Sequence, residues 1–179
     1  MASNLILPNR RSVLQGGAAL GALGLMGAPA MAAPKSGGRL RAALAEGATS
    51  DSLDPATYTD IYMISVGFAT HSTLTEIAPN GELVGDVAAS WEGADAARTW
   101  VFRLRPEATF SSGAKVTAED VIASINHHRG EESKSAAKDI VDPITEIRAD
   151  DSETVIFTLA GPNADFPYLM ADYHLLIMP

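Results

Sequence analysis

The clearest pattern in the chain is an alternation of apolar and mixed positions over Thr99–Leu104 (TWVFRL). Trp100 and Phe102 fall on one face of this segment, whereas Val101 and Arg103 fall on the other. A period of two residues is typical of a strand with one buried face. We therefore predict a strand here, with its aromatic side chains in the core.

Two segments carry signals for the start of a helix. The sequence Thr-Ala-Glu-Asp at 117–120 precedes an apolar run and has the spacing of a capping box. We predict a helix that extends from there to about Arg129, where Gly130 ends it. Asp60 stands directly before the apolar segment Ile61–Phe68, which predicts a second helix.

Shorter apolar runs, bounded by turn-forming residues, predict the remaining elements. Ala78–Gly81 contains an Asn-Gly pair, which is typical of a hairpin turn. Alternating strands and helices indicate an α/β fold with a core that includes Trp91, Trp100, Phe102 and Phe110. The further predicted elements are strands at Leu40–Leu44, Ile144–Arg148, Thr154–Leu159 and Leu175–Met178 and a short helix at Asp165–Ala171.

Composition narrows the possible functions. The chain has 179 residues, of which 46% are hydrophobic and 20% charged, as in a globular protein. Its 13 basic and 22 acidic residues give a net charge of −9, which disfavours a nucleic-acid partner. The absence of cysteine excludes disulfides, thiolate metal sites and cysteine nucleophiles.

The first 32 residues have the features of an export signal. Arg10 and Arg11 lie in the sequence NRRSVLQ, which resembles the twin-arginine motif, and a short segment of Gly, Ala and Leu follows. Small residues at 28–32 provide cleavage sites. We predict a twin-arginine signal peptide over residues 1–32, export to the periplasm and transient contact with the twin-arginine translocase. A retained membrane anchor over Val13–Ala33 is the alternative, which its many glycines disfavour.

Residues that carry catalytic or metal chemistry are sparse. None of the four histidines, His71, His127, His128 and His174, is in a His-x-x-x-His pair, the spacing of a zinc site. The adjacent pair would point about 100° apart on a helix, and we expect it at the surface. Neither a phosphate-binding glycine loop nor a nucleophile elbow is present. The sequence therefore predicts no catalytic residue, no metal site and no cofactor.

Several motifs stand in the order and spacing of one protein family. The chain resembles, over about residues 37–179, the extracellular solute-binding proteins of peptide/nickel ABC importers, which include the oligopeptide- and dipeptide-binding proteins. The motifs are Gly37–Leu40, Ser52–Pro55, Pro79–Leu83, Val87–Glu92, Thr99–Arg105, Ala108–Phe110, Ser112–Gly113, Val116–Val121 and Val155–Leu159.

The resemblance implies a periplasmic-binding-protein-like lobe of type II, with a mixed sheet and flanking helices. The lobe would be incomplete, because family members are several times longer, and residues 33–179 would form the N-terminal part of the first lobe. The apolar end at Leu175–Met178 gives the same expectation of a fragment, one that does not bind solute well by itself.

The resemblance also implies a function and a binding segment. The protein would capture peptides or related small solutes in the periplasm and deliver them to the membrane subunits of an ABC importer. In related peptide binders the loop after Leu-Asp-Pro offers main-chain contacts to the ligand, and the matching residues here are Thr59, Asp60, Ile61 and Tyr62. Asp60 has a second interpretation, as the cap of the following helix.

Two other interpretations stay open. One is a secreted hydrolase or metalloenzyme that is exported in the folded state, and the other is a truncated, inactive gene product. The sequence does not name the solute.

Overall fold

The computed structural model describes residues 37–179, which belong to two units divided between Ala42 and Ala43. The predicted signal peptide, with Arg10 and Arg11, lies outside the described residues. The predicted strand at Leu40–Leu44 is wrong, since these residues form neither helix nor strand and the Leu40 side chain is 91% exposed. Its sequence, Leu-Arg-Ala-Ala-Leu, offers no β-branched or aromatic side chain to pack on a pleated surface.

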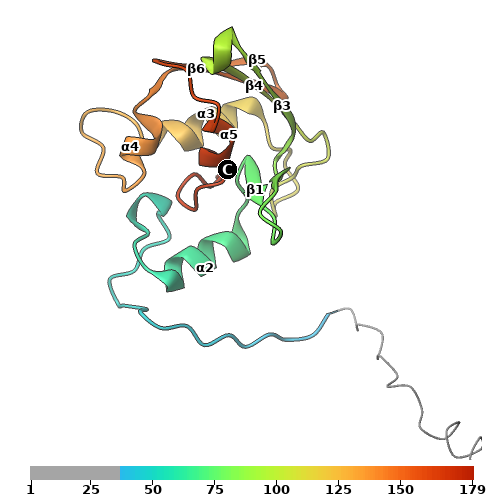
Figure 1. The fold of residues 1–179 in the computed structure, drawn as a ribbon. Helices are drawn as coiled ribbons and strands as arrows, with labels where there is room; N and C mark the ends of the chain where they lie inside the picture. The colour runs from blue at the N-terminus through green and yellow to red at the C-terminus, as the bar shows by residue number, and fades with distance from the viewer. Residues whose placement is uncertain (1–36) are drawn as a thin grey trace, which may run out of the picture. The chain divides into compact units, whose positions relative to one another are not determined.

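The unit from Ala43 to Pro179 contains short helices and two antiparallel sheets (Figure 1). Across residues 37–179, no helix combines the length and the apolarity that a bilayer crossing requires. The elements are η1 (Pro55–Thr57), α2 (Ile61–Thr70), β1 (Thr75–Ile77), β2 (Leu83–Gly85), β3 (Ala88–Ala94), η2 (Asp95–Ala97), β4 (Thr99–Leu104), α3 (Ala118–Asn126), α4 (Lys138–Val141), β5 (Ile144–Asp151), β6 (Thr154–Leu159) and α5 (Phe166–Leu169).

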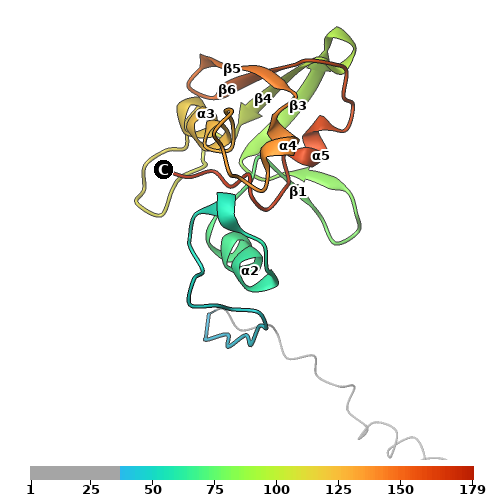
Figure 2. The same ribbon diagram turned by 90° about the vertical axis from the view of Figure 1, so that its left-hand side faces the viewer.

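The larger sheet has four strands in the order β3-β4-β6-β5, and β1 pairs with β2 in a separate hairpin. Figures 1 and 2 both show α3 and α5 on the same face of the larger sheet. The α/β class is confirmed. The expected mixed sheet is wrong, since every pairing of the described strands is antiparallel. Short turns account for this between β3 and β4 and between β5 and β6.

The core of this unit is built around an aromatic cluster. Phe102 of β4 is fully buried, and its ring lies 5.5 Å from that of Phe157 and 6.3 Å from that of Phe166, edge to face in both cases. Trp100 is also buried, and its indole N–H donates to the Asn163 carbonyl at 3.1 Å. The predicted strand and its buried face are therefore confirmed, while Trp91 and Phe110 are only partly buried against the core.

Helix α3 begins as its sequence predicts. The Thr117 hydroxyl accepts from the Asp120 amide, and the Asp120 carboxylate accepts from the Thr117 amide, which completes the capping box. The helix ends at Asn126, three residues before the predicted end, and a turn leads to Gly130 with its φ of 104°. This positive φ explains why a glycine occupies the position.

The segment 175–177 packs in two directions. Leu175 and Ile177 belong to the main core, whereas Leu176 packs on Tyr58 and Met63 in a second, smaller cluster. The predicted burial on both sides is confirmed, but the predicted strand is reduced to a single bridge between Ile177 and Ser72. In Figures 1 and 2 this part of the chain runs between α2 and the helices under the larger sheet.

Replacing the central aromatic residue tests this description of the core. Phe102→Ala is expected to lower the free energy of unfolding by about 3–5 kcal/mol, because it removes a buried ring and leaves a cavity. Denaturant unfolding of the 179-residue protein measures the change. Ile77→Ala, at a side chain that is 52% exposed, is the control and should cost only about 0.5 kcal/mol. Equal losses for the two variants would contradict the central place of Phe102.

Candidate functional site

The four residues predicted to contact a solute lie at the surface, where η1 leads into α2. Thr59 is exposed, Asp60 is half-buried, and Ile61 and Tyr62 are 49% and 38% exposed. All four residues are therefore at least partly exposed to solvent.

Two aspartates determine the path of the chain through this segment. The Asp54 carboxylate accepts from the Ala56 amide at 3.0 Å and caps η1, in which Pro55 occupies the first position. Six residues later, the Asp60 carboxylate accepts from the Met63 amide at 2.9 Å and caps α2. The predicted capping by Asp60 is thus confirmed, and the predicted binding segment runs from the end of the capped η1 into the first turn of the capped α2.

One main-chain donor at the start of α2, the Ile61 amide, is only weakly engaged. The Ile61 amide reaches the Glu46 carboxylate at 3.5 Å, a distance at the long limit of a hydrogen bond. Asp60 has extended backbone angles, so the chain enters the helix directly at Ile61. A carbonyl or carboxylate oxygen of a solute could therefore compete with Glu46 for this donor.

Behind the segment, Tyr58 is an anchor that the sequence analysis did not identify. Its ring lies against Gly67 of α2, where an added Cβ would stand 2.8 Å from the ring, and its hydroxyl donates to the Leu53 carbonyl at 3.1 Å. Its own carbonyl accepts from His174 Nε2 at 2.8 Å. Only a glycine allows this close approach of ring and helix.

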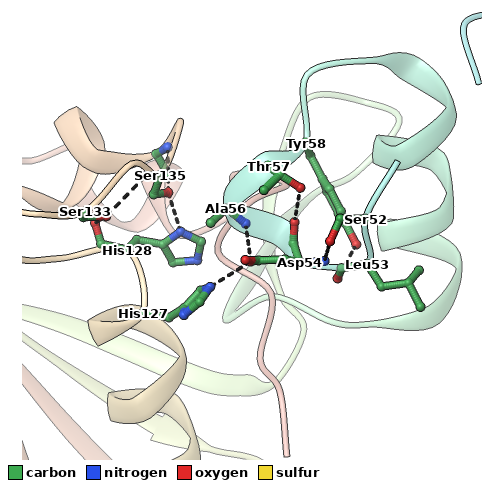
Figure 3. A network of polar contacts seen from close by, with 11 residues as sticks. Ser52, Leu53, Asp54, Ala56, Thr57, Tyr58, His127, His128, Ser133 and Ser135 are labelled. Carbon is green, nitrogen blue, oxygen red and sulfur yellow. Dashed lines mark hydrogen bonds and ion pairs between the residues drawn. The ribbon is translucent and has the colours of Figure 1, made fainter. Parts of the chain in front are cut away.

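A polar network joins η1 to the C-terminal end of α3 (Figure 3). Asp54 Oδ1 lies 2.7 Å from His127 Nε2, and His128 Nδ1 lies 2.6 Å from the Ser135 hydroxyl. Partial burial raises the pKa of Asp54, but the hydrogen bonds from His127 and from the Ala56 amide outweigh it, so the pKa lies below its usual value. Asp54 is therefore ionised and accepts both bonds.

His128 differs sharply from its neighbour. Its side chain is almost completely buried, and its Nε2 atom has no hydrogen-bond partner. Burial, together with the positive charges of His127 and His174, lowers the pKa of His128 to about 4. The expectation that both residues of the pair lie at the surface is thus wrong for His128, because it follows Val121 and Ile125 at helical spacing, on the face that these two residues bury in the core.

Two pockets adjoin the region, but neither is lined by Thr59–Tyr62. One, of about 430 Å³, lies between η1, the end of α3 and the segment 176–179, with the His127–Asp54 pair at its wall. The other, of about 680 Å³, lies beyond the C-terminal end of α2 and includes Arg105. The predicted segment therefore offers an open surface rather than an enclosed cavity.

The chemistry of this surface is that of binding. In the part of the chain that the structure describes, no group of three histidines and carboxylates could hold a metal ion. The available groups are the main-chain amide of Ile61 at the start of α2, the half-exposed side chains of Ile61 and Tyr62, and the ionised carboxylate of Asp54. Such a set can pair with the main chain or carboxylate of an extended ligand.

Residues 82–178 match the model of the family described as bacterial extracellular solute-binding proteins, family 5 Middle. The chain belongs to this family. It is 32% identical over 137 residues to DdpA of Escherichia coli (strain K12), a probable D,D-dipeptide-binding periplasmic protein.

Solved structures of family relatives share the fold. AgaA from A. tumefacien R10, determined in complex with agropinic acid, has 27% sequence identity and a TM-score of 0.68. OppA of Burkholderia pseudomallei has 28% sequence identity and a TM-score of 0.66. These are type II periplasmic binding proteins, so the expected fold type is confirmed.

The matches cover only part of the relatives. Each of these three proteins matches 72% of this chain, but the chain covers 26% of DdpA, 26% of AgaA and 28% of OppA. The chain thus spans about a quarter of the length of the relatives that it matches.

The buried histidine gives a pH dependence that can be measured. In the unfolded chain His128 binds a proton near pH 6.5, whereas in the folded protein it does so only near pH 4. Its contribution to stability is therefore complete above about pH 6.5 and is lost as the pH falls toward 4. Denaturant unfolding at a series of pH values should show this loss, and His128→Gln should make the dependence shallower.

The control for this measurement is His71→Gln. It replaces a histidine at the end of α2, outside the core, whose ring bonds to the neighbouring Thr70 hydroxyl. An identical slope for His128→Gln and for the wild type between pH 4 and 6.5 would show that the buried ring is not neutral.

Proposed function

We propose that this protein is a substrate-binding component of an ABC importer that captures peptides or related small solutes in the periplasm. The observation that carries the proposal is the family match over residues 82–178 on a fold that leaves Thr59–Tyr62 accessible. The membrane subunits of the importer would be its partners. Its action would be binding and release rather than catalysis.

We further propose that Thr59–Tyr62 forms part of one wall of the binding site. The weakly engaged Ile61 amide at the start of α2 suits the carbonyl or carboxylate oxygens that peptides carry. DdpA is named for D,D-dipeptides and AgaA was solved with agropinic acid, and both relatives are about four times longer than the part matched here. Because a single wall gives few contacts, binding by the 179-residue chain should be weak.

The solute class is narrowed by the same groups. A main-chain amide distinguishes an oxygen acceptor from an apolar group, but it does not select among side chains. We therefore expect discrimination by backbone and carboxylate chemistry, with short peptides as the first candidates and amino-acid-derived carboxylates as the second.

We also propose that residues 1–32 direct export through the twin-arginine translocase. The support is the pair Arg10-Arg11, the weakly apolar segment after it and the small residues at 28–32. Periplasmic location agrees with the family, whose relative DdpA is named as a periplasmic protein.

Charge-conserving substitutions test the export route. Arg10→Lys combined with Arg11→Lys should leave uncleaved precursor in the cytoplasm, because the twin-arginine motif requires the arginine pair whereas a general secretory signal requires only positive charge. Cell fractionation with immunoblotting measures the distribution. Lys35→Arg, which lies beyond the predicted signal, is the control. Normal export of the double variant would leave only the general secretory route.

A proline at the start of α2 tests the binding segment. Ile61→Pro removes the main-chain donor, and the fold should survive because position 61 opens the helix and Asp60 before it is extended. In NMR titrations with trialanine, the wild-type protein should show amide shift changes at 59–62 with a Kd of roughly millimolar order. Ile61→Pro should abolish them.

Ile61→Ala is the matched control, since it removes the side chain and keeps the amide. It should retain at least the greater part of the trialanine response. Two results would refute the proposal: shift changes confined to other regions of the protein, or equal binding by the proline and alanine variants.

A further inference from the structure

The cavity of about 680 Å³ beyond the C-terminal end of α2 combines two opposite charges with two aromatic rings. Arg105, which follows β4, and Asp86, which follows β2, lie on its wall. Phe68 of α2 and Phe110 lie on the same wall. The volume is in the range of cavities that hold small molecules in proteins. The proposed function uses none of these side chains.

The Arg105 guanidinium is fixed in position, and most of its donors are still available. Nε donates to the Asp86 carbonyl at 2.7 Å, and Nη2 donates to the Gly85 carbonyl at 3.0 Å. A guanidinium has five N–H groups, and the other three form no hydrogen bond within residues 37–179. The Glu107 carboxylate lies 4.0 Å from Nη1, which is too far for a hydrogen bond. The Arg105 side chain is 41% exposed, so a solute can reach it.

Asp86 supplies the opposite charge on the same wall. Its Oδ2 accepts from the Thr73 amide at 2.9 Å, whereas its main-chain carbonyl accepts from Arg105. Among the described residues, the Asp86 carboxylate and the Arg105 guanidinium form no ion pair with each other. The two charges are therefore neighbours in the cavity, and each is left to pair with a ligand.

The aromatic rings give the cavity an apolar surface beside these charges. Phe68 is 52% exposed, and Phe110 is only partly buried against the core. The loop that carries Phe110 is ordered by a bridge between Thr109 and Lys115 and by the bond from the Phe110 amide to the Ala114 carbonyl at 2.9 Å. An apolar side chain of a ligand can pack against rings that are held in this way.

We propose that this cavity is a second binding site, which takes a free α-amino acid with an apolar or aromatic side chain. The carboxylate of the amino acid accepts from the Arg105 guanidinium, and its ammonium group donates to the Asp86 carboxylate. The side chain packs against Phe68 and Phe110. The proposal does not depend on the proposed function, because the cavity is not lined by any residue of Thr59–Tyr62.

The charges of the cavity favour a zwitterion over an anion. A phosphate or a simple carboxylate can pair with Arg105, but it is repelled by the Asp86 carboxylate and by a chain with a net charge of −9. A zwitterion pairs with both protein groups and adds no net charge. In an α-amino acid a single carbon joins the ammonium group to the carboxylate, which suits two protein charges that are neighbours without touching.

Three related small molecules test the proposal on the 179-residue protein. They are L-phenylalanine, 3-phenylpropionate, which lacks the ammonium group, and 2-phenylethylamine, which lacks the carboxylate. In ¹H–¹⁵N NMR titrations, L-phenylalanine should shift the amides of residues 85–86 and 105–112. Its Kd should be of roughly millimolar order, as expected for a ligand of about a dozen non-hydrogen atoms.

The other two molecules should bind about fivefold more weakly, because each loses one half-exposed ion pair. Equal binding of the three molecules would overturn the proposal, because the charges would then not be read. Shift changes confined to other parts of the protein would overturn it as well.

Asp86→Asn separates the charge from its structural hydrogen bond. Asparagine keeps an oxygen that can accept from the Thr73 amide, but it carries no charge. This variant should bind L-phenylalanine about fivefold more weakly and should lose the preference over 3-phenylpropionate. Glu82→Gln, which removes an exposed carboxylate outside the cavity, is the control and should keep the wild-type affinities.

An Asp86→Asn variant that keeps the wild-type preference for L-phenylalanine would refute the role of Asp86. The comparison of the three molecules uses the wild-type protein, so it decides even where a variant does not fold. The two binding proposals also fail separately. A response to L-phenylalanine at 105–112 without a trialanine response at 59–62 would refute the proposed binding segment alone, and the converse result would refute only the amino-acid site.

Discussion

The double burial of the segment 175–177 is the constraint on which the rest of the unit depends. Leu175 and Ile177 enter the core under the four-stranded sheet, and Leu176 enters the cluster with Tyr58 and Met63 on the side of α2. An extended chain places successive side chains on opposite sides, so three consecutive residues can join two apolar clusters. Helix α2 and the segment before it are thereby attached to the main core.

Elements that depend on neighbours in sequence could be predicted. The capping box of α3, the Asp60 cap of α2 and the alternation in β4 are local signals, and the structure contains all three. Strand β3 was not predicted, because its sequence AASWEGA consists largely of small residues without an alternating pattern. Its strand conformation comes from pairing with β4, which is a tertiary effect.

For the candidate site, too, only features that depend on neighbouring residues in the sequence could be predicted. The segment Thr59–Tyr62 stays a prediction from a family motif, but the contacts that hold it in place could not be predicted from the sequence. The partners Tyr58 and His174 are 116 residues apart. The burial of His128, in contrast, could have been predicted from its helical spacing to Val121 and Ile125. The spacing Asp-x-His at 172–174 is a weak sequence signal for a histidine that pairs with a nearby carboxylate.

The alternating contacts of segment 175–177 also restrict how the chain can change over evolutionary time. Deleting or inserting one residue between His174 and Ile177 would reverse the side to which each later side chain points. Side chains that now pack in the main core would then enter the smaller cluster, and the reverse. Insertion or deletion of two residues keeps each side chain pointing to its own cluster and changes only the length of the segment. Homologues should therefore vary here by substitution among apolar residues or by paired insertions, and seldom by a single insertion or deletion.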